Sequence, residues 1–190
     1  MISMLGRFCV PFYFWENAGK AMVFSGFVCY TERKTKGCFL MDHVILAGDL
    51  FLEGYNCAQA LAVAFCDVTG MEKQTAAKLA APFGGGMGRM REVCGAVSGM
   101  FMVLGALYGY DNSDADSKKK ELYQQVQALA EQFRQENGSI ICREILKNPP
   151  SDPNPSPRTA EYYAKRPCCR MVMSAARLMD AFITEHPLEK

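Results

Sequence analysis

The sequence has little of what several common protein classes need. It has only two histidines, which poorly supply a histidine-rich metal site or a Cys–His catalytic pair, although His43 remains available for such a pair. No two cysteines have the C-x-x-C spacing of a zinc ribbon or a thioredoxin-type motif. The formal net charge of +1 indicates neither a nucleic-acid surface nor a polybasic membrane surface. The sequence also has no evident set of acid and base residues for a hydrolase or transferase.

Long apolar runs are absent as well. Residues 8–15 and 21–30 are apolar, but each run is far below the ~20 residues of a membrane span. Arg7 and the run after it only faintly resemble a signal peptide, because no clear small-residue cleavage site follows. We therefore expect no membrane insertion and a location in the reducing cytoplasm, where cysteines are more often ligands or redox groups than disulfides.

Residues 1–40 form a poorly specified extension in this interpretation. They lie upstream of Met41, which is a plausible natural start of the chain. The alternative is a real N-terminal hairpin, whose strands would contain apolar residues of this segment: Phe12, Phe14, Val23, Phe27 and Val28.

Residues 41–190 read as one all-α domain, a compact multi-helix bundle. Apolar residues recur at helical spacing, and Asp42 and Asn56 are suited to cap the first two helices. Helices are expected from Asp42 to Gly54, from Cys57 to Gly70, over 72–81, from Cys94 to about Tyr108, over 117–136, over about 140–146, over 159–165 and from Pro167 to about Phe182. Residues 148–157 carry five of the nine prolines and predict a stiff surface connection.

A glycine-rich turn precedes the central buried helix. Pro82 and the glycines after it end the preceding helix, and Cys94 is expected in the first turn of the next one. Unpaired N–H groups and the helix dipole favour a thiolate there, and Arg89 and Arg91 act in the same direction, whereas Glu92 opposes it. The alternative is that Cys94 is simply a small buried hydrophobic residue.

The glycines do not form a phosphate-binding loop. Gly84 and Gly86 are followed by Arg89 where G-x-G-x-x-G needs its third glycine, and no G-K-[ST] sequence follows. Gly95 and Gly99 lie on one helical face, where another backbone can approach closely.

The nine cysteines divide into two groups. Cys57, Cys94 and Cys168 each stand at an expected helix start, and Cys142 lies on a short helix, so these four favour redox or ligand chemistry. The others carry no such signal: Cys66 is expected in the core, Cys169 is a spare beside Cys168, and Cys9, Cys29 and Cys38 belong to the extension.

Five segments, in order, resemble the bacterial and archaeal C_GCAxxG_C_C family of putative redox-active proteins. They are Gly54-Tyr55-Asn56-Cys57-Ala58-Gln59-Ala60, Phe83-Gly84-Gly85-Gly86-Met87-Gly88, Cys94-Gly95-Ala96-Val97-Ser98-Gly99, the stretch from Phe133 through Asn137-Gly138-Ser139 to Cys142-Arg143-Glu144, and a late cysteine before an apolar helix. The resemblance covers about residues 42–183. It implies that the family's four cysteines are Cys57, Cys94, Cys142 and Cys168, with Cys168 preferred to Cys169 because it stands three residues before Met171-Val172.

A related domain of split-Soret cytochromes implies that this scaffold holds an iron–sulfur cluster. The haem motif C-x-x-C-H of those proteins is absent from this sequence, so haem is not expected. The first hypothesis is therefore an oxidoreductase or electron-transfer protein whose four thiolates bind an iron–sulfur cluster or another soft metal. Around this cofactor we expect Gly84, Gly85, Gly86, Gly88, Arg89 and Gly95.

Two alternatives stay open. In the first, a metal-free protein cycles between dithiol and disulfide, with Cys94 as the attacking thiolate and with a redox partner that the sequence does not identify. In the second, the protein is a non-catalytic interaction module with buried structural cysteines. Its Gly95/Gly99 face would then pack on a partner or on a second copy, which would make a homodimer.

Overall fold

The computed structural model describes residues 23–24, 27–28, 42–113 and 115–188, and the chain divides into the units Met1–Leu40 and Met41–Lys190. In the first unit, β1 (Val23–Phe24) pairs with β2 (Phe27–Val28) in antiparallel register, Val23 with Val28 and Phe24 with Phe27. This short pairing contains three of the residues named for the alternative hairpin. The other expectations for residues 1–40, including the start at Met41 and the roles of Cys9, Cys29 and Cys38, lie outside the described residues.

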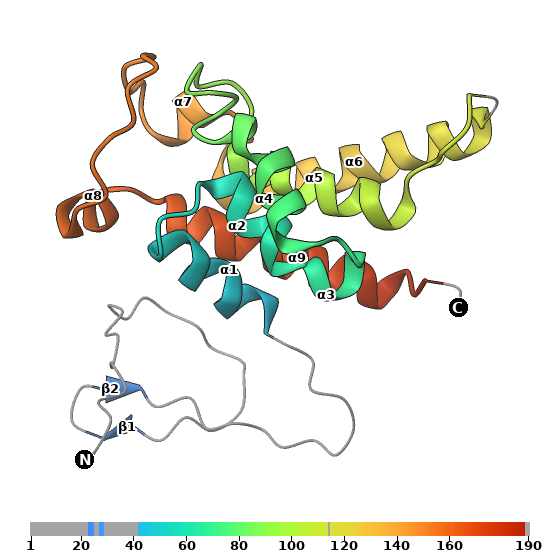
Figure 1. The fold of residues 1–190 in the computed structure, drawn as a ribbon, viewed down its shortest axis with the longest axis horizontal. Coiled ribbons are helices and arrows are strands. Elements are labelled where there is room, and N and C mark those ends of the chain that lie inside the picture. The colour runs from blue at the N-terminus through green and yellow to red at the C-terminus, as the bar shows by residue number, and fades with distance from the viewer. Residues whose placement is uncertain (1–22, 25–26, 29–41, 114, 189–190) are drawn as a thin grey trace. The chain divides into compact units, whose positions relative to one another are not determined.

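The second unit is all-α where it is described, as the sequence predicted (Figure 1). Its elements are α1 (His43–Leu52), α2 (Cys57–Ala64), α3 (Cys66–Thr69), α4 (Lys73–Ala80), the 3-10 turn η1 (Ala81–Phe83), α5 (Gly95–Tyr108), α6 (Asp116–Asn137), α7 (Cys142–Ile145), α8 (Ala160–Lys165) and α9 (Cys168–Glu185). The proline-rich segment 148–157 forms neither helix nor strand, as expected. None of these described helices combines the length and apolar character that a membrane crossing needs.

Both predicted N-caps are present. The Asp42 carboxylate accepts a hydrogen bond from the Ile45 N–H and starts α1. Asn56 starts α2 through a capping box: its Oδ1 accepts from the N–H groups of Ala58 and Gln59, and the Gln59 side chain accepts from the Asn56 N–H. The second helix is shorter than predicted, because it ends at Ala64 and Cys66 begins α3 instead of lying near the end of α2.

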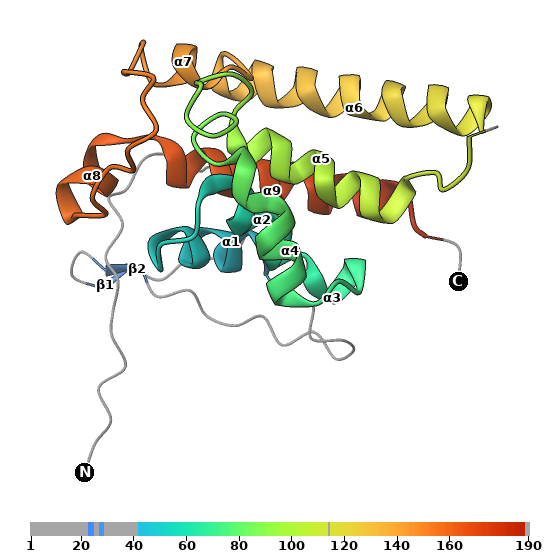
Figure 2. The same cartoon turned by 45° about the horizontal axis from the view of Figure 1, so that its top comes forward.

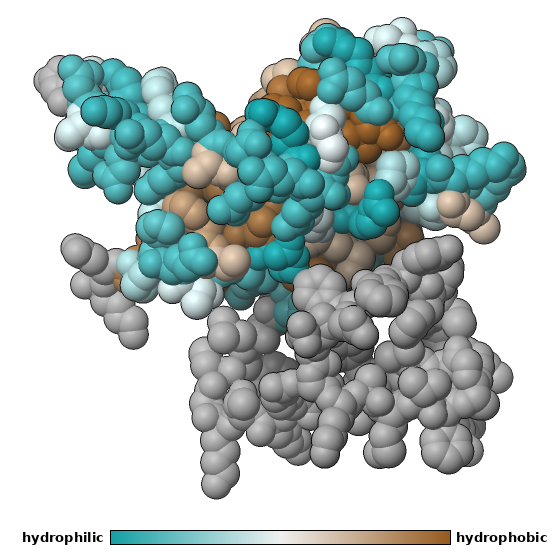
Figure 3. Space-filling view, turned by 180° about the vertical axis from the view of Figure 1, so that it is seen from behind, coloured by the Kyte–Doolittle hydropathy of each residue, from teal (hydrophilic) through white to brown (hydrophobic). Residues whose placement is uncertain are grey.

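The core forms where α1, α2, α5 and α9 pack together, and α6 covers α5 and α9 (Figure 2). Fully buried side chains from these helices include Phe51, Leu61 and Met179. In α4 only Ala76 and Ala80 are buried, because they face α2, whereas Leu79 is 55% exposed. On the face drawn in Figure 3, hydrophilic residues cover most of the described surface and hydrophobic residues show in smaller areas between them.

The close-approach face of α5 is occupied within the chain. A Cβ at Gly99 would lie 2.7 Å from Leu61 Cβ and 2.8 Å from the Ala58 carbonyl oxygen, and a Cβ at Gly95 would lie 3.1 Å from Cys57 Cβ. The expectation that another backbone approaches there is confirmed, and that backbone is α2. This face is therefore not available to a partner or a second copy, which corrects the surface assumed for the interaction module.

A buried histidine joins three helices. His43 is 3% exposed, its Nδ1 lies 2.5 Å from Asp180 on α9, and its Nε2 lies 3.1 Å from Asp67 on α3. The His43 ring also stacks on Phe65 at a centroid distance of 4.2 Å. Burial lowers the pKa of His43, but the hydrogen bonds and charges of the two carboxylates outweigh it and raise the pKa above 6.5. The protonated imidazole, which donates from both ring nitrogens, therefore stabilises the fold.

The His43 cluster predicts a pH-dependent stability. Because the folded pKa is raised, its contribution is complete below about pH 6.5 and is lost as the pH rises through the folded value. Replacing His43 with Gln should remove this decline and cost about 2 kcal/mol at pH 6.5, the cost of breaking buried charge-assisted hydrogen bonds. Urea unfolding across this pH range measures both effects. His186→Gln is the control, and an unchanged decline in His43→Gln would contradict the assignment.

Two glycines of α5 give a matched packing test. Gly99→Ala should destabilise the protein by about 1 to 3 kcal/mol, because the new methyl group meets the backbone of α2. Gly105→Ala in the same helix meets nothing within 4 Å and should stabilise it by up to about 1 kcal/mol through helix propensity. Urea unfolding measures the pair, and equal effects at both positions would show that α2 does not pack on Gly99.

Candidate functional site

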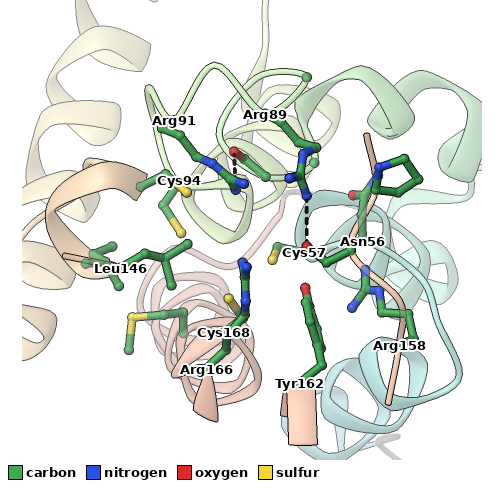
Figure 4. Close-up of a pocket in the computed structure, with 18 of the residues that line it drawn as sticks. Asn56, Cys57, Arg89, Arg91, Cys94, Leu146, Arg158, Tyr162, Arg166 and Cys168 are labelled. Carbon is green, nitrogen blue, oxygen red and sulfur yellow. Dashed lines mark hydrogen bonds between the residues drawn. The ribbon is translucent and has the colours of Figure 1, made fainter. Parts of the chain in front are cut away.

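One cavity of about 280 Å³ brings together the four cysteines singled out in the sequence (Figure 4). Cys57, Cys94, Cys142 and Cys168 all line it, and each is between 5% and 9% exposed. They come from parts of the chain that are up to about a hundred residues apart, so only the tertiary fold makes them neighbours. The cavity is therefore the candidate site.

Each of these cysteines stands at the start of a helix. Cys57, Cys142 and Cys168 are the first residues of α2, α7 and α9, whereas Cys94 is the N-cap of α5, one position before the expected first turn. At α5 the N–H groups of Ala96 and Val97 hydrogen-bond to the Cys94 sulfur. The first N–H groups of α2 are instead capped by Asn56, and those of Cys142 and Arg143 in α7 donate to backbone carbonyls, so these two helix starts offer mainly the partial positive charge of the dipole.

The glycine-rich turn adopts left-handed backbone angles that bring two cysteine-bearing segments together. Gly85, Gly86 and Gly88 have φ of 66°, 76° and 62°. A Cβ on Gly86 would lie only 2.6 Å from Cys142 Cβ, so a side chain there would displace Cys142. After the turn, the Cys94 N–H donates to the Ile140 carbonyl at 2.8 Å, beside an isolated antiparallel bridge between Val93 and Ile141.

The residues expected around a cofactor divide into two sets. Gly84, Gly85, Gly88 and Arg89 line the cavity. Gly86 and Gly95 are not among its lining residues and instead allow the close approach of Cys142 and Cys57. These two glycines therefore position the cysteines without facing the cavity.

Arginines surround the sulfur atoms, and two of them were not found from the sequence. Arg89 donates to the Asp152 carboxylate and to Ser156, and Arg91 donates to the carbonyl oxygens of Pro150 and Gly85. Arg158 and Arg166 also line the cavity and contact the ring of Tyr162. The one signal for them in the sequence was the position of Arg166, two residues before Cys168.

The thiols differ sharply in acidity. The Cys168 pKa is lowered to about 7, first by a hydrogen bond with the Cys57 thiol and then by the charges of Arg166, Arg158 and Arg91, against a desolvation cost. The same hydrogen bond, together with burial, raises the pKa of Cys57 well above its usual value. Cys57 and Cys168 thus form a neighbouring pair of which Cys168 ionises first.

The expectation of a thiolate at Cys94 is wrong for the metal-free protein. Burial raises the pKa of Cys94 to about 12, although the N–H groups of Ala96 and Val97 favour the thiolate. Arg89 is turned to Asp152 and Ser156. Burial also raises the pKa of Cys142, which the charge of Arg91 offsets only in part. Desolvation exceeds the helix-start effect at both positions.

The remaining cysteines in the described residues lie elsewhere. Cys66 is half-buried and its thiol donates to the Ala62 carbonyl, so it is less deeply placed than the core position expected for it. Cys169 does not line the cavity, and its Sγ lies 3.9 Å from where a Cβ on Gly48 of α1 would stand. His43 is engaged with its two carboxylates and does not line the cavity, so the described residues form no Cys–His pair there.

The four cavity thiols supply the ligand type that soft metals and iron–sulfur groups use. Within the described part of the chain, no three Cys, His, Asp or Glu side chains are grouped closely enough to hold a metal ion. The four thiols instead line a shared cavity, and thiolates are the ligands that iron–sulfur groups use. In type and number these residues fit such a group.

Comparison with known proteins gives one match. A family model described as "Putative redox-active protein (C_GCAxxG_C_C)" matches residues 55–182, which include all four cavity cysteines. No curated protein and no solved structure matches the chain.

The acidity order of the thiols is directly measurable. In reduced, metal-free protein, iodoacetamide should modify Cys168 with a midpoint near pH 7, whereas Cys94 should stay unmodified until far more alkaline pH. Cys57→Ala should raise the Cys168 midpoint because it removes the main stabilising hydrogen bond, and Cys66→Ala should leave it unchanged. Peptide mass spectrometry reads the modified positions, and earlier labelling of Cys94 in the folded protein would contradict this order.

Proposed function

Because this chain belongs to the C_GCAxxG_C_C family, we propose that it is a redox protein whose reaction centre is the four-cysteine cavity. One observation carries the proposal: four buried cysteines at helix starts line a single cavity that four arginines also line. Redox centres need ionisable sulfur, limited access to water and charges that set the potential, and the cavity offers all three.

We propose that the cavity holds an iron–sulfur cluster, with Cys57, Cys94, Cys142 and Cys168 as its ligands. When bound, such a cluster supplies electron transfer. The chain's own residues favour its negative charge: guanidinium groups of Arg91 and Arg166 border the cavity, and the helix starts add partial positive charge. The high thiol pKa of Cys94 makes binding depend on the release of a proton, as is usual for thiolate ligands.

A dithiol–disulfide reaction is the second candidate, and the hydrogen-bonded pair of Cys57 and Cys168 favours it. The Cys168 thiolate attacks one sulfur of a partner's disulfide, forms a mixed disulfide and releases the first partner thiolate. The Cys57 sulfur then attacks the Cys168 sulfur, forms the Cys57–Cys168 bond, releases the second partner thiolate and gives its proton to it. The partner gains the two electrons that the cysteine pair loses. Cys168 thus replaces Cys94 as the attacking thiol.

The first experiment measures iron, acid-labile sulfide and the visible spectrum of protein purified without oxygen. We expect iron and sulfide with charge-transfer bands, and most of the iron should be lost in Cys57→Ser, Cys94→Ser, Cys142→Ser or Cys168→Ser. Cys169→Ser is the matched control, because Cys169 is adjacent to Cys168 in sequence but does not line the cavity, and it should keep the iron.

The same preparation separates the two candidates. Protein without iron or sulfide, even after reconstitution, would contradict the cluster. Mild oxidation should then lower the mass by two hydrogens and link the peptides of Cys57 and Cys168. If neither iron nor this reversible disulfide is found, both redox candidates fail.

A further inference from the structure

The cysteine cavity holds positive charge that carboxylates do not balance. No Asp or Glu is among its lining residues, whereas Arg89, Arg91, Arg158 and Arg166 are. Arg89 pairs with Asp152 at 3.0 Å. No ion pair joins the other three arginines to any described residue. Of these three, Arg91 is buried, Arg166 is half-buried and Arg158 is exposed. Buried charges in proteins are normally paired, so Arg91 in particular calls for a partner of opposite sign.

Arg91 has an unused donor. The residue is 3% exposed, its Nε donates to the Pro150 carbonyl at 3.1 Å and its Nη1 to the Gly85 carbonyl at 3.4 Å. Its Nη2 is buried and has no hydrogen-bond partner in the described structure, and a side-chain hydrogen bond from the Arg91 guanidinium also favours the Cys142 thiolate. Figure 4 shows the guanidinium directed into the cavity. A buried donor without a partner is costly, and here it faces a space that a ligand can occupy.

The guanidinium groups of Arg158 and Arg166 both contact one aromatic ring. Both guanidinium groups lie over the ring of Tyr162, with centroid distances of 4.9 Å and 4.8 Å. Arg158 donates one weak bond to the Tyr55 carbonyl at 3.4 Å, and no described residue hydrogen-bonds to Arg166. These cation–π contacts draw both guanidinium groups to the Tyr162 ring without using their N–H donors. In Figure 4 the side chains of Arg166 and Tyr162 both point toward the centre of the cavity.

The cavity lining contains no carboxylate to balance the guanidinium groups of Arg91, Arg158 and Arg166. Planar guanidinium groups with free N–H edges match the geometry of carboxylate, phosphate and sulfate oxygens.

We propose that the arginine side of this cavity is a binding site for a small oxyanion group, with Arg91, Arg158 and Arg166 as its donors and Cys168 beside it. The group is a carboxylate, phosphate or sulfate, either free or as the acidic end of a larger substrate. The inference goes beyond the proposed function, because it concerns the cations of the cavity and stands whether the thiols hold a cluster or form a disulfide.

Calorimetric titration of the reduced full-length chain with inorganic phosphate at low ionic strength tests the site. Iron is measured in the same sample, and iron-free and iron-containing preparations are titrated separately. Arg166→Met keeps the aliphatic stem but loses the donors, so it should weaken phosphate binding by about tenfold or more, and Arg158→Met should act in the same direction. Arg170→Met, which removes the same charge from an exposed position in the first turn of α9 and outside the cavity lining, is the matched control and should change the affinity less than twofold.

Protection of Cys168 supplies a second readout. Phosphate should slow the modification of Cys168 by iodoacetamide, which is a neutral reagent, in the unaltered chain but not in Arg166→Met. For each variant, the rate with phosphate is compared with the rate without it. Cys66, outside the cavity, should be modified equally fast with and without phosphate.

Three results would overturn the inference. One is the absence of phosphate binding in both preparations. Another is an equal loss of affinity in Arg166→Met and Arg170→Met, which would show diffuse charge attraction. The third is unchanged phosphate binding in Arg166→Met together with loss of iron, which would show that the arginines serve only a cluster. Phosphate binding without any iron would instead support the oxyanion site while contradicting the cluster.

Discussion

The arrangement of the site depends on the side-chain amide of Asn56. Its oxygen accepts from the N–H groups of Ala58 and Gln59, which fixes the first turn of α2 and therefore the position of Cys57. Its Nδ2 donates to the Ala81 carbonyl at 3.0 Å, which ties the start of the glycine-rich turn to the same point. A Cβ on Gly84 would lie 2.5 Å from the Asn56 Cγ, so only glycine permits this contact. One amide thus aligns the two segments from which the rest of the cavity is built.

The cavity sets two electrostatic effects against each other. Burial disfavours every thiolate, and it prevails at Cys94 although this residue caps a fourteen-residue helix. At Cys168 a neighbouring thiol and the arginines prevail instead, so the first residue of an eighteen-residue helix becomes the acidic cysteine. The difference does not come from helix length or from the dipole, which favour both residues. It comes from a specific neighbour, because the Cys57 thiol donates to Cys168.

The sequence predicted the parts of this protein that local chemistry determines. Capping by Asp42 and Asn56 and the positions of Cys57 and Cys168 at helix starts follow from short-range rules, and the set of four cysteines follows from the family resemblance. The arginines of segment 150–166 were missed because their role arises from long-range packing that folds this segment over the cysteines. The prediction of a thiolate at Cys94 was wrong for the same reason. The spacing of residues shows a helix start, but it does not show how completely the tertiary fold excludes water from the thiol.

Under the proposed function and the proposed oxyanion site, charge on the sulfur atoms and anion binding by the arginines are coupled in one small cavity. Arg158, Arg166 and Arg91 lower the pKa of Cys168 by their charge, so an anion that binds them must raise that pKa again. By linkage, ionisation of Cys168 weakens the binding of the anion by the same factor. A disulfide between Cys57 and Cys168 carries no charge and leaves the guanidinium groups unbalanced, which strengthens anion binding. An iron–sulfur group, being negative, weakens it. The redox state of the cysteines therefore sets how strongly this cavity holds an acidic ligand, and an acidic ligand in turn shifts the redox state.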